Sequence, residues 1–507
     1  MVPARAGARW LARLDQCERL VVQGAISRRA PLATLAGLLA VALAALVLLL
    51  PDMLALWLVA GGSLVALVAL EPFSAFLLLP CAVAFGSLVS LSVAGVNIGP
   101  TDLLVGAVTL VWLIRHRRRL GRVLSLLQPS RLRSLWAGER APFLVLLALA
   151  AYLLAVCLSM VVALDKVATL KEIVKWSEVL VIVALSAVYL RTELRVRAVI
   201  WTTIGAATLE ALYGFVQWVA ATGQAGPGGS SLRVFGTFDQ PNPYGGFLNF
   251  GLMLALALVL FGHDARERWA AGGASALLLG AQLLANSRGA LLGFGVGLLV
   301  MVVVGWRRER LAAVVAAIAI PLLAIMWAVG LIPSRLREAI LDQLRIGNAL
   351  SGAVTSANYS TVERLAHWIA GLRMFAARPV LGVGAGNYNA AYPRYALPDW
   401  PEALGHAHNY YLNTAAETGI LGSGAFVALT VATVYLGWYT VRRVRAFAGP
   451  RSSLPALALG LLASVVALAA HNLTDDLFVH AMELQFALML GCQFALLRLA
   501  GHREPGV

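Results

Sequence analysis

The chain has 507 residues, of which 60% are hydrophobic and only 13% are charged. Surface-to-volume scaling requires more polar surface of any water-soluble domain, so this composition excludes a soluble globular protein and predicts a polytopic membrane protein. The formal net charge of +15 reflects 40 Lys and Arg residues against 25 Asp and Glu residues. In a membrane protein, an excess of basic residues sets the orientation of the chain across the bilayer, so we expect no nucleic-acid partner. The four cysteines lack metal-ligand spacing, which argues against a zinc site or a disulfide framework.

The expected fold class is all-α: a helix bundle of about twelve to fourteen transmembrane helices with a long, partly helical periplasmic loop. Residues 1–32 combine arginines with apolar residues, which is typical of a cytoplasmic interfacial amphipathic segment. Apolar stretches of spanning length follow, and each crossing needs ~20 residues of helix to satisfy its backbone inside hydrocarbon. They are residues 33–50, 53–70, 75–94, 101–114, 142–163, 177–190, 198–220, 243–261, 269–285, 289–305, 311–331, 409–440, 454–471 and 482–499.

The loops between these spans alternate in charge. Basic loops at 115–140, 191–197, 266–268, 307–310 and 442–445 fall on one side, which the positive-inside rule assigns to the cytoplasm together with both termini. The less charged loops at 165–176, 221–242, 286–289, 332–407 and 471–476 face outward. The expected organisation is therefore a bundle at 33–331, a periplasmic loop at 332–407, C-terminal membrane helices at 408–500 and a cytoplasmic tail at 501–507.

Arginines on the outer side are the first candidates for function. Arg233 lies in an outer loop whose Asn242 is placed to cap the next helix. A guanidinium there runs against the orientation bias and needs an anion or a partner. Arg288, in the tight turn after Asn286, either extends to the interface or binds an anion. Arg364 points away from its neighbour Glu363 on a helix, which leaves it available for a ligand.

The sharpest cluster surrounds His408, at the entry of a membrane helix after the long outer loop. An imidazole with an unperturbed pKa near ~6.5 can exchange protons near neutrality. His406 is interpreted as a helix-entry residue, Asn409 as a helix cap, and Glu417 as a buried hydrogen-bonding group. In the last outer loop, His471, Asp475 and Asp476 yield no confident metal-ligand set. The glycine-rich runs at 226–231 and 382–386 lack nucleotide-binding spacing.

Several of these residues together resemble a known family. His408 and Asn409, then nine residues, then Gly419-Ile-Leu-Gly422 fit a pattern of bacterial O-antigen ligases (WaaL). The wider group, which includes Wzy-type O-antigen polymerases and related oligosaccharyltransferases, is indicated by further elements. They are Phe235-Gly-Thr-Phe238, Pro241-Asn242, Ser287-Arg288-Gly289, Arg364 with Trp368, and Pro379-Val-Leu-Gly-Val-Gly384.

The resemblance implies a metal-independent glycosyltransferase without a cofactor, similar in fold to GT-C-like lipid-sugar transferases. Its donor would be an undecaprenyl-pyrophosphate-linked glycan and its acceptor lipid A-core or another glycan. The reaction would take place at the periplasmic face of the bacterial inner membrane, in contact with membrane lipids. By the same resemblance, His408 would be the general base, and Arg233 and Arg364 would bind the pyrophosphate. The less direct candidates for substrate binding are Arg288, Asn242, Asn409, Tyr410 and Glu417.

The chemistry of the residues agrees with this expectation. A histidine can accept the proton of an attacking sugar hydroxyl, and guanidinium groups match a pyrophosphate leaving group with bidentate hydrogen bonds. Direct displacement predicts inversion at the anomeric carbon. Three alternatives stay open: a Wzy-type polysaccharide polymerase, a protein O-oligosaccharyltransferase, and a lipid-linked glycan flippase or transporter that breaks no bond.

Overall fold

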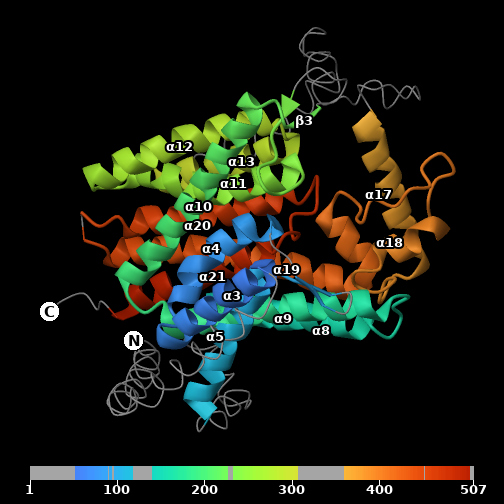
Figure 1. Ribbon diagram of the computed structural model, residues 1–507, viewed down its shortest axis with the longest axis horizontal. Coiled ribbons are helices and arrows are strands. Elements are labelled where there is room, and N and C mark those ends of the chain that lie inside the picture. The colour runs from blue at the N-terminus through green and yellow to red at the C-terminus, as the bar shows by residue number, and fades with distance from the viewer. Residues whose placement is uncertain are drawn as a thin grey trace, which may run out of the picture.

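A computed structural model describes residues 52–88, 91–93, 96–117, 140–225, 232–306, 359–449 and 451–502. Helices make up most of this part of the chain (Figure 1). The expected segment 1–32 and the expected spans at 33–50 and 311–331 lie outside the described residues. The helices are α3 (Asp52–Leu70), α4 (Ser74–Phe85), η2 (Gly86–Leu88), α5 (Pro100–His116), α8 (Arg140–Ser159), α9 (Lys166–Tyr189), α10 (Glu193–Val219), α11 (Pro241–Phe261), α12 (Ala265–Ala285), α13 (Arg288–Gly305), α17 (Tyr359–Ala377), α18 (Tyr388–Ala391), η6 (Tyr392–Arg394), α19 (Tyr410–Phe447), α20 (Leu454–His471) and α21 (Met482–His502).

Seven of the described helices are long and apolar enough to cross a membrane. They are α8, α10, α11, α13, α19, α20 and α21, and each has at least 18 residues. At ~1.5 Å per residue, such lengths approach or exceed the ~30 Å hydrocarbon core of a bilayer. The expectation of an all-α, multi-pass membrane protein is thus confirmed.

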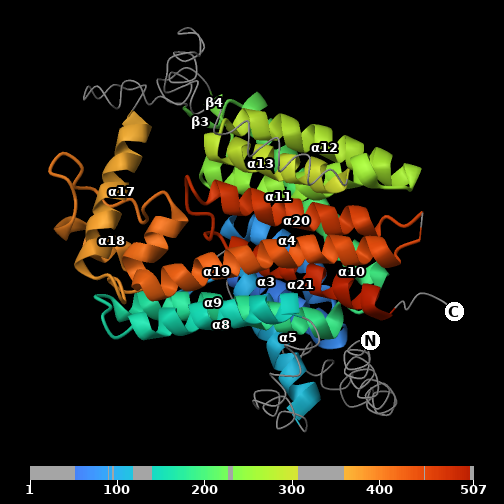
Figure 2. The ribbon, with the colours of Figure 1, turned by 180° about the vertical axis from the view of Figure 1, so that it is seen from behind.

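The bundle has a buried centre and an apolar outer surface. Helices α11, α20 and α21 are mostly buried, whereas α8, α13 and α19 leave most of their residues on the surface. In Figure 2, α20 lies between α11 and α19, and the α8–α9 pair covers one flank. Exposed leucines and valines on the outer helices face the region where lipid tails would lie.

Two segments differ from the sequence-based expectation. The span predicted at 75–94 ends with η2 at Leu88, and an antiparallel hairpin follows, formed by β1 (Leu91–Val93) and β2 (Val96–Ile98). The outer loop predicted at 165–176 is instead the start of α9. Its first turn is capped by Asp165, whose carboxylate accepts from the amides of Val167 and Ala168 at 2.8 and 3.1 Å. The three lysines in this segment favoured a loop, because charged residues are rare inside membranes. A helix end at the membrane interface tolerates such charges, since long side chains reach the water.

The arginine-rich turns gather at one end of the bundle. Arg445 donates to the carbonyls of Val304 and Gly305, and Arg498 donates to the carbonyls of Ala187 and Leu190. At the same end, Arg197 forms ion pairs with Glu193 and Glu267. Helix α17 and the short helix α18 lie at the opposite end (Figure 1). Of the turns predicted to face the cytoplasm, the described ones at 191–197, 266–268 and 442–445 are therefore separated from the described part of the segment predicted to face outward.

Helix α19 is broken near its start, and the break explains part of the sequence motif. Gly419 has φ +63° and ψ −159°, a conformation that ends regular helical hydrogen bonding. The freed carbonyls of Ala416 and Glu417 accept from the amides of Val383 and Gly384 at 3.0 and 2.8 Å. The amide of Ile420 donates to Pro379 at 2.7 Å. The loop at 379–384 is therefore hydrogen-bonded into the break in α19.

Gly419→Ala should disrupt this junction. A Cβ at Gly419 would lie 2.3 Å from the backbone of Val380, and the left-handed φ adds strain. Overlap with backbone cannot be relieved by a side-chain rotation, so we expect a loss of about 3 kcal/mol or more of stability. The matched control is Gly424→Ala in the same helix, because a Cβ at Gly424 meets nothing within 4 Å. Thermal unfolding in detergent measures both, and equal melting temperatures for the two variants would contradict this account of the break.

Candidate functional site

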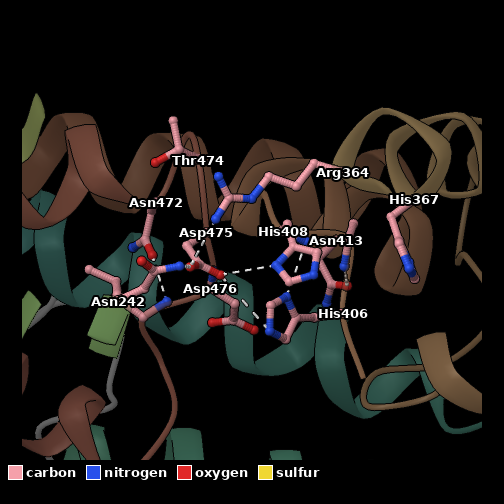
Figure 3. A network of polar contacts seen from close by, with 12 residues as sticks. Asn242, Arg364, His367, His406, His408, Asn413, Asn472, Thr474, Asp475 and Asp476 are labelled. Carbon is pink, nitrogen blue, oxygen red and sulfur yellow. Dashed lines mark hydrogen bonds and ion pairs between the residues drawn. The ribbon is translucent and has the colours of Figure 1, made fainter. Parts of the chain in front are cut away.

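Asp475 is the centre of a polar cluster in the turn between α20 and α21 (Figure 3). One carboxylate oxygen, Oδ1, lies 3.3 Å from Nδ1 of His408 and 4.0 Å from Nε2 of His406. The other oxygen, Oδ2, accepts a hydrogen bond from Asn242 and lies 4.0 Å from Nη2 of Arg364. Three of the residues predicted from the sequence, His408, Arg364 and Asn242, thus meet at one carboxylate.

The start of α19 holds His408 against this turn. His408 has a left-handed φ of +51°, and Asn409 caps the helix by accepting from the amide of Leu412 at 3.0 Å. The amide of Tyr410 donates to the carbonyls of Asn472 and Asp475 at 2.9 and 3.1 Å. The first amides of a helix have no acceptor within the helix and need other partners. Here the acceptors in the 472–475 turn hold that turn beside the imidazole of His408.

The two ring nitrogens of His408 have different surroundings. Nδ1 faces the Asp475 carboxylate, whereas Nε2 is buried and has no hydrogen-bond partner among the described residues. A carboxylate next to Nδ1 favours the tautomer that carries its proton there. The lone pair of Nε2 is then available. The indole of Trp368 donates to the His408 carbonyl at 3.5 Å, which links α17 to the same loop.

Asn242 connects Arg233 to the cluster. The guanidinium of Arg233 donates to the Ala285 carbonyl at 3.1 Å and to the Asn242 oxygen at 3.3 Å. The Ser287 hydroxyl donates to the same oxygen at 2.8 Å, and the Asn242 amide nitrogen donates to Asp475. The turn between α12 and α13 and the start of α11 therefore place Arg233 one side chain away from Asp475.

The Asp475 carboxylate remains ionised because of these neighbours. Burial alone would raise the pKa of Asp475, but the hydrogen bond with His408 and the coulombic effect of the neighbouring His406, His408 and Arg364 outweigh burial. The net result is a pKa below the ordinary value. A buried anion with several donors is stable, whereas removing the carboxylate would leave those donors without a partner.

His367 lies one turn beyond Arg364 on α17 but turns away from Asp475 (Figure 3). Its ring stacks on Tyr392 with centroids 4.5 Å apart, and Nδ1 lies 3.2 Å from the Tyr388 hydroxyl. Burial, with the neighbouring His408 and His406, lowers the pKa of His367 to about 4. A neutral His367 therefore packs α17 against the 388–392 segment.

The side chains of three other predicted residues have surroundings of their own. The Glu417 carboxylate accepts from the Tyr388 amide at 2.8 Å, which agrees with its interpretation as a buried hydrogen-bonding group. The Tyr410 side chain points into an aromatic cluster, where its hydroxyl lies 3.1 Å from that of Tyr152. Arg288 is half-buried and begins α13 next to Ser287.

Sequence reasoning did not assign Asp475 a role, although its loop was noted. Its importance depends on contacts with residues 67 positions away or more, for which spacing gives no signal. Asp475 also completes a set of metal-ligand types that the sequence analysis did not assemble. His406, His408 and Asp475 place one ligand atom each within 4.8 Å of one another.

Comparison with protein families identifies one match. Residues 273–424 match the family model described as O-antigen ligase. The matched region contains Arg288, Arg364 and His408, whereas Arg233 and Asp475 lie outside it. No curated protein matches the chain.

Proposed function

We propose that this chain, whose residues 273–424 match the O-antigen ligase family model, belongs to the O-antigen ligase and Wzy family and transfers a glycan from undecaprenyl pyrophosphate to lipid A-core. The family supports a glycosyltransferase-type activity, and the donor, acceptor and residue roles are our proposal. The observation that carries it is the meeting of His408 and Arg364 at Asp475, with Arg233 linked through Asn242.

In the proposed reaction, His408 is the general base. An acceptor hydroxyl gives its proton to Nε2 while its oxygen attacks the anomeric carbon of the donor sugar. The bond from that carbon to the pyrophosphate oxygen breaks, and undecaprenyl pyrophosphate leaves with the electron pair. A single displacement inverts the anomeric carbon and needs no covalent intermediate. Asp475 orients the imidazole through Nδ1 and stabilises the imidazolium that forms.

The arginines are proposed to stabilise the leaving group. A guanidinium remains charged at all relevant pH values and presents a planar array of donors that suits phosphate oxygens. The Arg364 side chain is 24% exposed and 4.0 Å from Asp475, so it can turn toward an anion without losing a tight ion pair. At a low-dielectric boundary, two such charges favour the developing pyrophosphate without a metal ion.

The site is proposed to face the periplasm of a bacterial inner membrane, with both termini in the cytoplasm. The arginine-rich turns lie at the opposite end of the bundle from α17 and α18 (Figure 1). By the positive-inside rule, the arginine-rich end belongs in the cytoplasm. Lipid-linked donor and acceptor would then both reach Asp475 and His408 from the outer leaflet.

A transfer assay tests this proposal. Purified protein in lipid vesicles receives a radiolabelled undecaprenyl-pyrophosphate glycan with lipid A-core, a second lipid-linked glycan or an acceptor protein in separate reactions. We expect label on lipid A-core, at a rate unchanged by EDTA. Arg233→Ala and Arg364→Ala should each slow transfer at least about tenfold, which corresponds to ~1.4 kcal/mol of transition-state stabilisation.

Each other outcome identifies a different activity. Label that moves only to the second lipid-linked glycan identifies a polymerase, and label on the protein identifies an oligosaccharyltransferase. Donor that crosses the vesicle membrane intact, with no product in any reaction, contradicts the transferase and supports a flippase.

A further inference from the structure

The cluster around Asp475 contains a set of side chains that suits a transition-metal ion. His406, His408 and Asp475 each offer one ligand atom, and these atoms lie within 4.8 Å of one another. Toward Oδ1 of Asp475, the nitrogens are Nε2 of His406 and Nδ1 of His408. Tetrahedral zinc with bonds of ~2.0–2.2 Å separates its ligands by roughly 3–4 Å. The His408–Asp475 pair, at 3.3 Å, already meets that spacing, and the His406–Asp475 pair, at 4.0 Å, is close to it.

The ligands can adjust to a metal and can be reached from outside. They come from the loop before α19 and the turn after α20, so none of the three is held inside a helix. The His406 and His408 side chains are 19% and 17% exposed, whereas Asp475 is 6% exposed. Two imidazoles and one carboxylate leave a fourth position for water, as in open zinc sites.

The charges around Asp475 indicate that a metal ion would bind there reversibly. Oδ1 faces the two imidazoles, and Oδ2 faces Asn242 and Arg364. A metal on Oδ1 therefore leaves the contacts of Oδ2 in place, although the Arg364 charge opposes a cation and weakens its binding. Imidazole ligands favour zinc over magnesium, which prefers oxygen ligands and water.

We propose that His406, His408 and Asp475 form a zinc site whose occupation inhibits the enzyme; the inhibitory part rests on the proposed function. Zinc on Nδ1 of His408 replaces the proton that Nδ1 donates to Asp475. The single proton of the neutral imidazole then resides on Nε2. A protonated Nε2 has no lone pair for the acceptor hydroxyl, so zinc removes the general base without displacing His408 from the site.

Zinc binding is tested directly, without reference to activity. The full chain in detergent is treated with EDTA, freed of chelator and dialysed against zinc chloride or magnesium chloride. His406→Asn removes Nε2 but keeps an oxygen near the position of Nδ1, which accepts from the His408 amide at 3.1 Å. We expect this variant to bind zinc at least about tenfold more weakly than the wild type. The matched control His480→Asn, in the turn between α20 and α21 that also holds Asp475, should bind zinc like the wild type, and magnesium should not bind at this site.

Transfer rates in zinc then test the inhibition. Zinc should inhibit the wild type and His480→Asn, and EDTA should restore their activity, whereas His406→Asn should stay active at the same zinc concentration. Equal zinc affinities for the wild type and His406→Asn would overturn the site. If His406→Asn binds zinc more weakly but zinc does not inhibit transfer by the wild type, the regulatory role would be overturned. If the wild type binds zinc through His406 but transfers no glycan under any condition, the proposed function fails and the zinc site stands.

Discussion

His408→Asn should lose about 10²–10⁴-fold in the rate of glycan transfer, the range that a positioned general base contributes. Asn tolerates the left-handed backbone that His408 adopts at φ +51°, and its amide can still donate to Asp475. What the variant lacks is a proton acceptor at the position of Nε2, which is buried and accepts no hydrogen bond from the described residues. The measurement is single-turnover transfer in vesicles with saturating donor.

The adjacent histidine provides the matched control for this experiment. His406→Asn alters an imidazole two residues away and should keep transfer within a few fold of the wild type in EDTA. Binding of undecaprenyl pyrophosphate by His408→Asn should also be close to that of the wild type, since the pyrophosphate is assigned to the arginines. Transfer by His408→Asn at nearly the wild-type rate would remove the general base from the mechanism.

Asp475→Asn should lower the turnover number by about 10²–10³-fold, because its amide presents no charge to the imidazole. If the amide nitrogen faces Nδ1 of His408, it donates there and places the histidine proton on Nε2. If the amide oxygen faces Nδ1, the tautomer survives, but the imidazolium formed in the reaction loses its anionic partner. Both orientations weaken the base, and steady-state kinetics should show the loss in kcat with little change in the donor KM.

A structural role for Asp475 would give a different pattern. Asn retains the size of the side chain and at least part of its hydrogen bonding, so the melting temperature should fall only slightly. The neighbour Asp476 accepts from the Phe478 amide at 2.9 Å, and Asp476→Asn keeps an acceptor there. That control should lose less than about tenfold in kcat. Equal kcat values for the two variants would show that Asp475 does not act through His408.

Much of the fold could be predicted because membrane spans depend on local composition. The predicted spans at 243–261, 454–471 and 482–499 coincide closely with α11, α20 and α21. The start of α9 could not be predicted in the same way. Its exposed Lys166 and Lys171 lower the local apolar character, and the capping contact of Asp165 is visible only in the folded chain.

The candidate site was predictable where a short motif carried it. His408 was identified by its spacing from Gly419, and the structure gives that spacing a physical basis in the helix cap at Asn409 and the break at Gly419. Asp475 had no such local signal, because its partners come from α11, α17 and the loop before α19. The sequence left two roles open for Glu417, a structural hydrogen-bonding group and a substrate contact. The hydrogen bond that its carboxylate accepts from the Tyr388 amide favours the structural role.

The most direct test of the mechanism is a structure of the full chain with undecaprenyl pyrophosphate in a lipid nanodisc. The account predicts pyrophosphate density within hydrogen-bonding distance of Arg364 and Arg233, with Nε2 of His408 facing the space that the donor sugar occupies before transfer. Pyrophosphate bound away from both arginines, or separated from His408 by protein, would contradict the account.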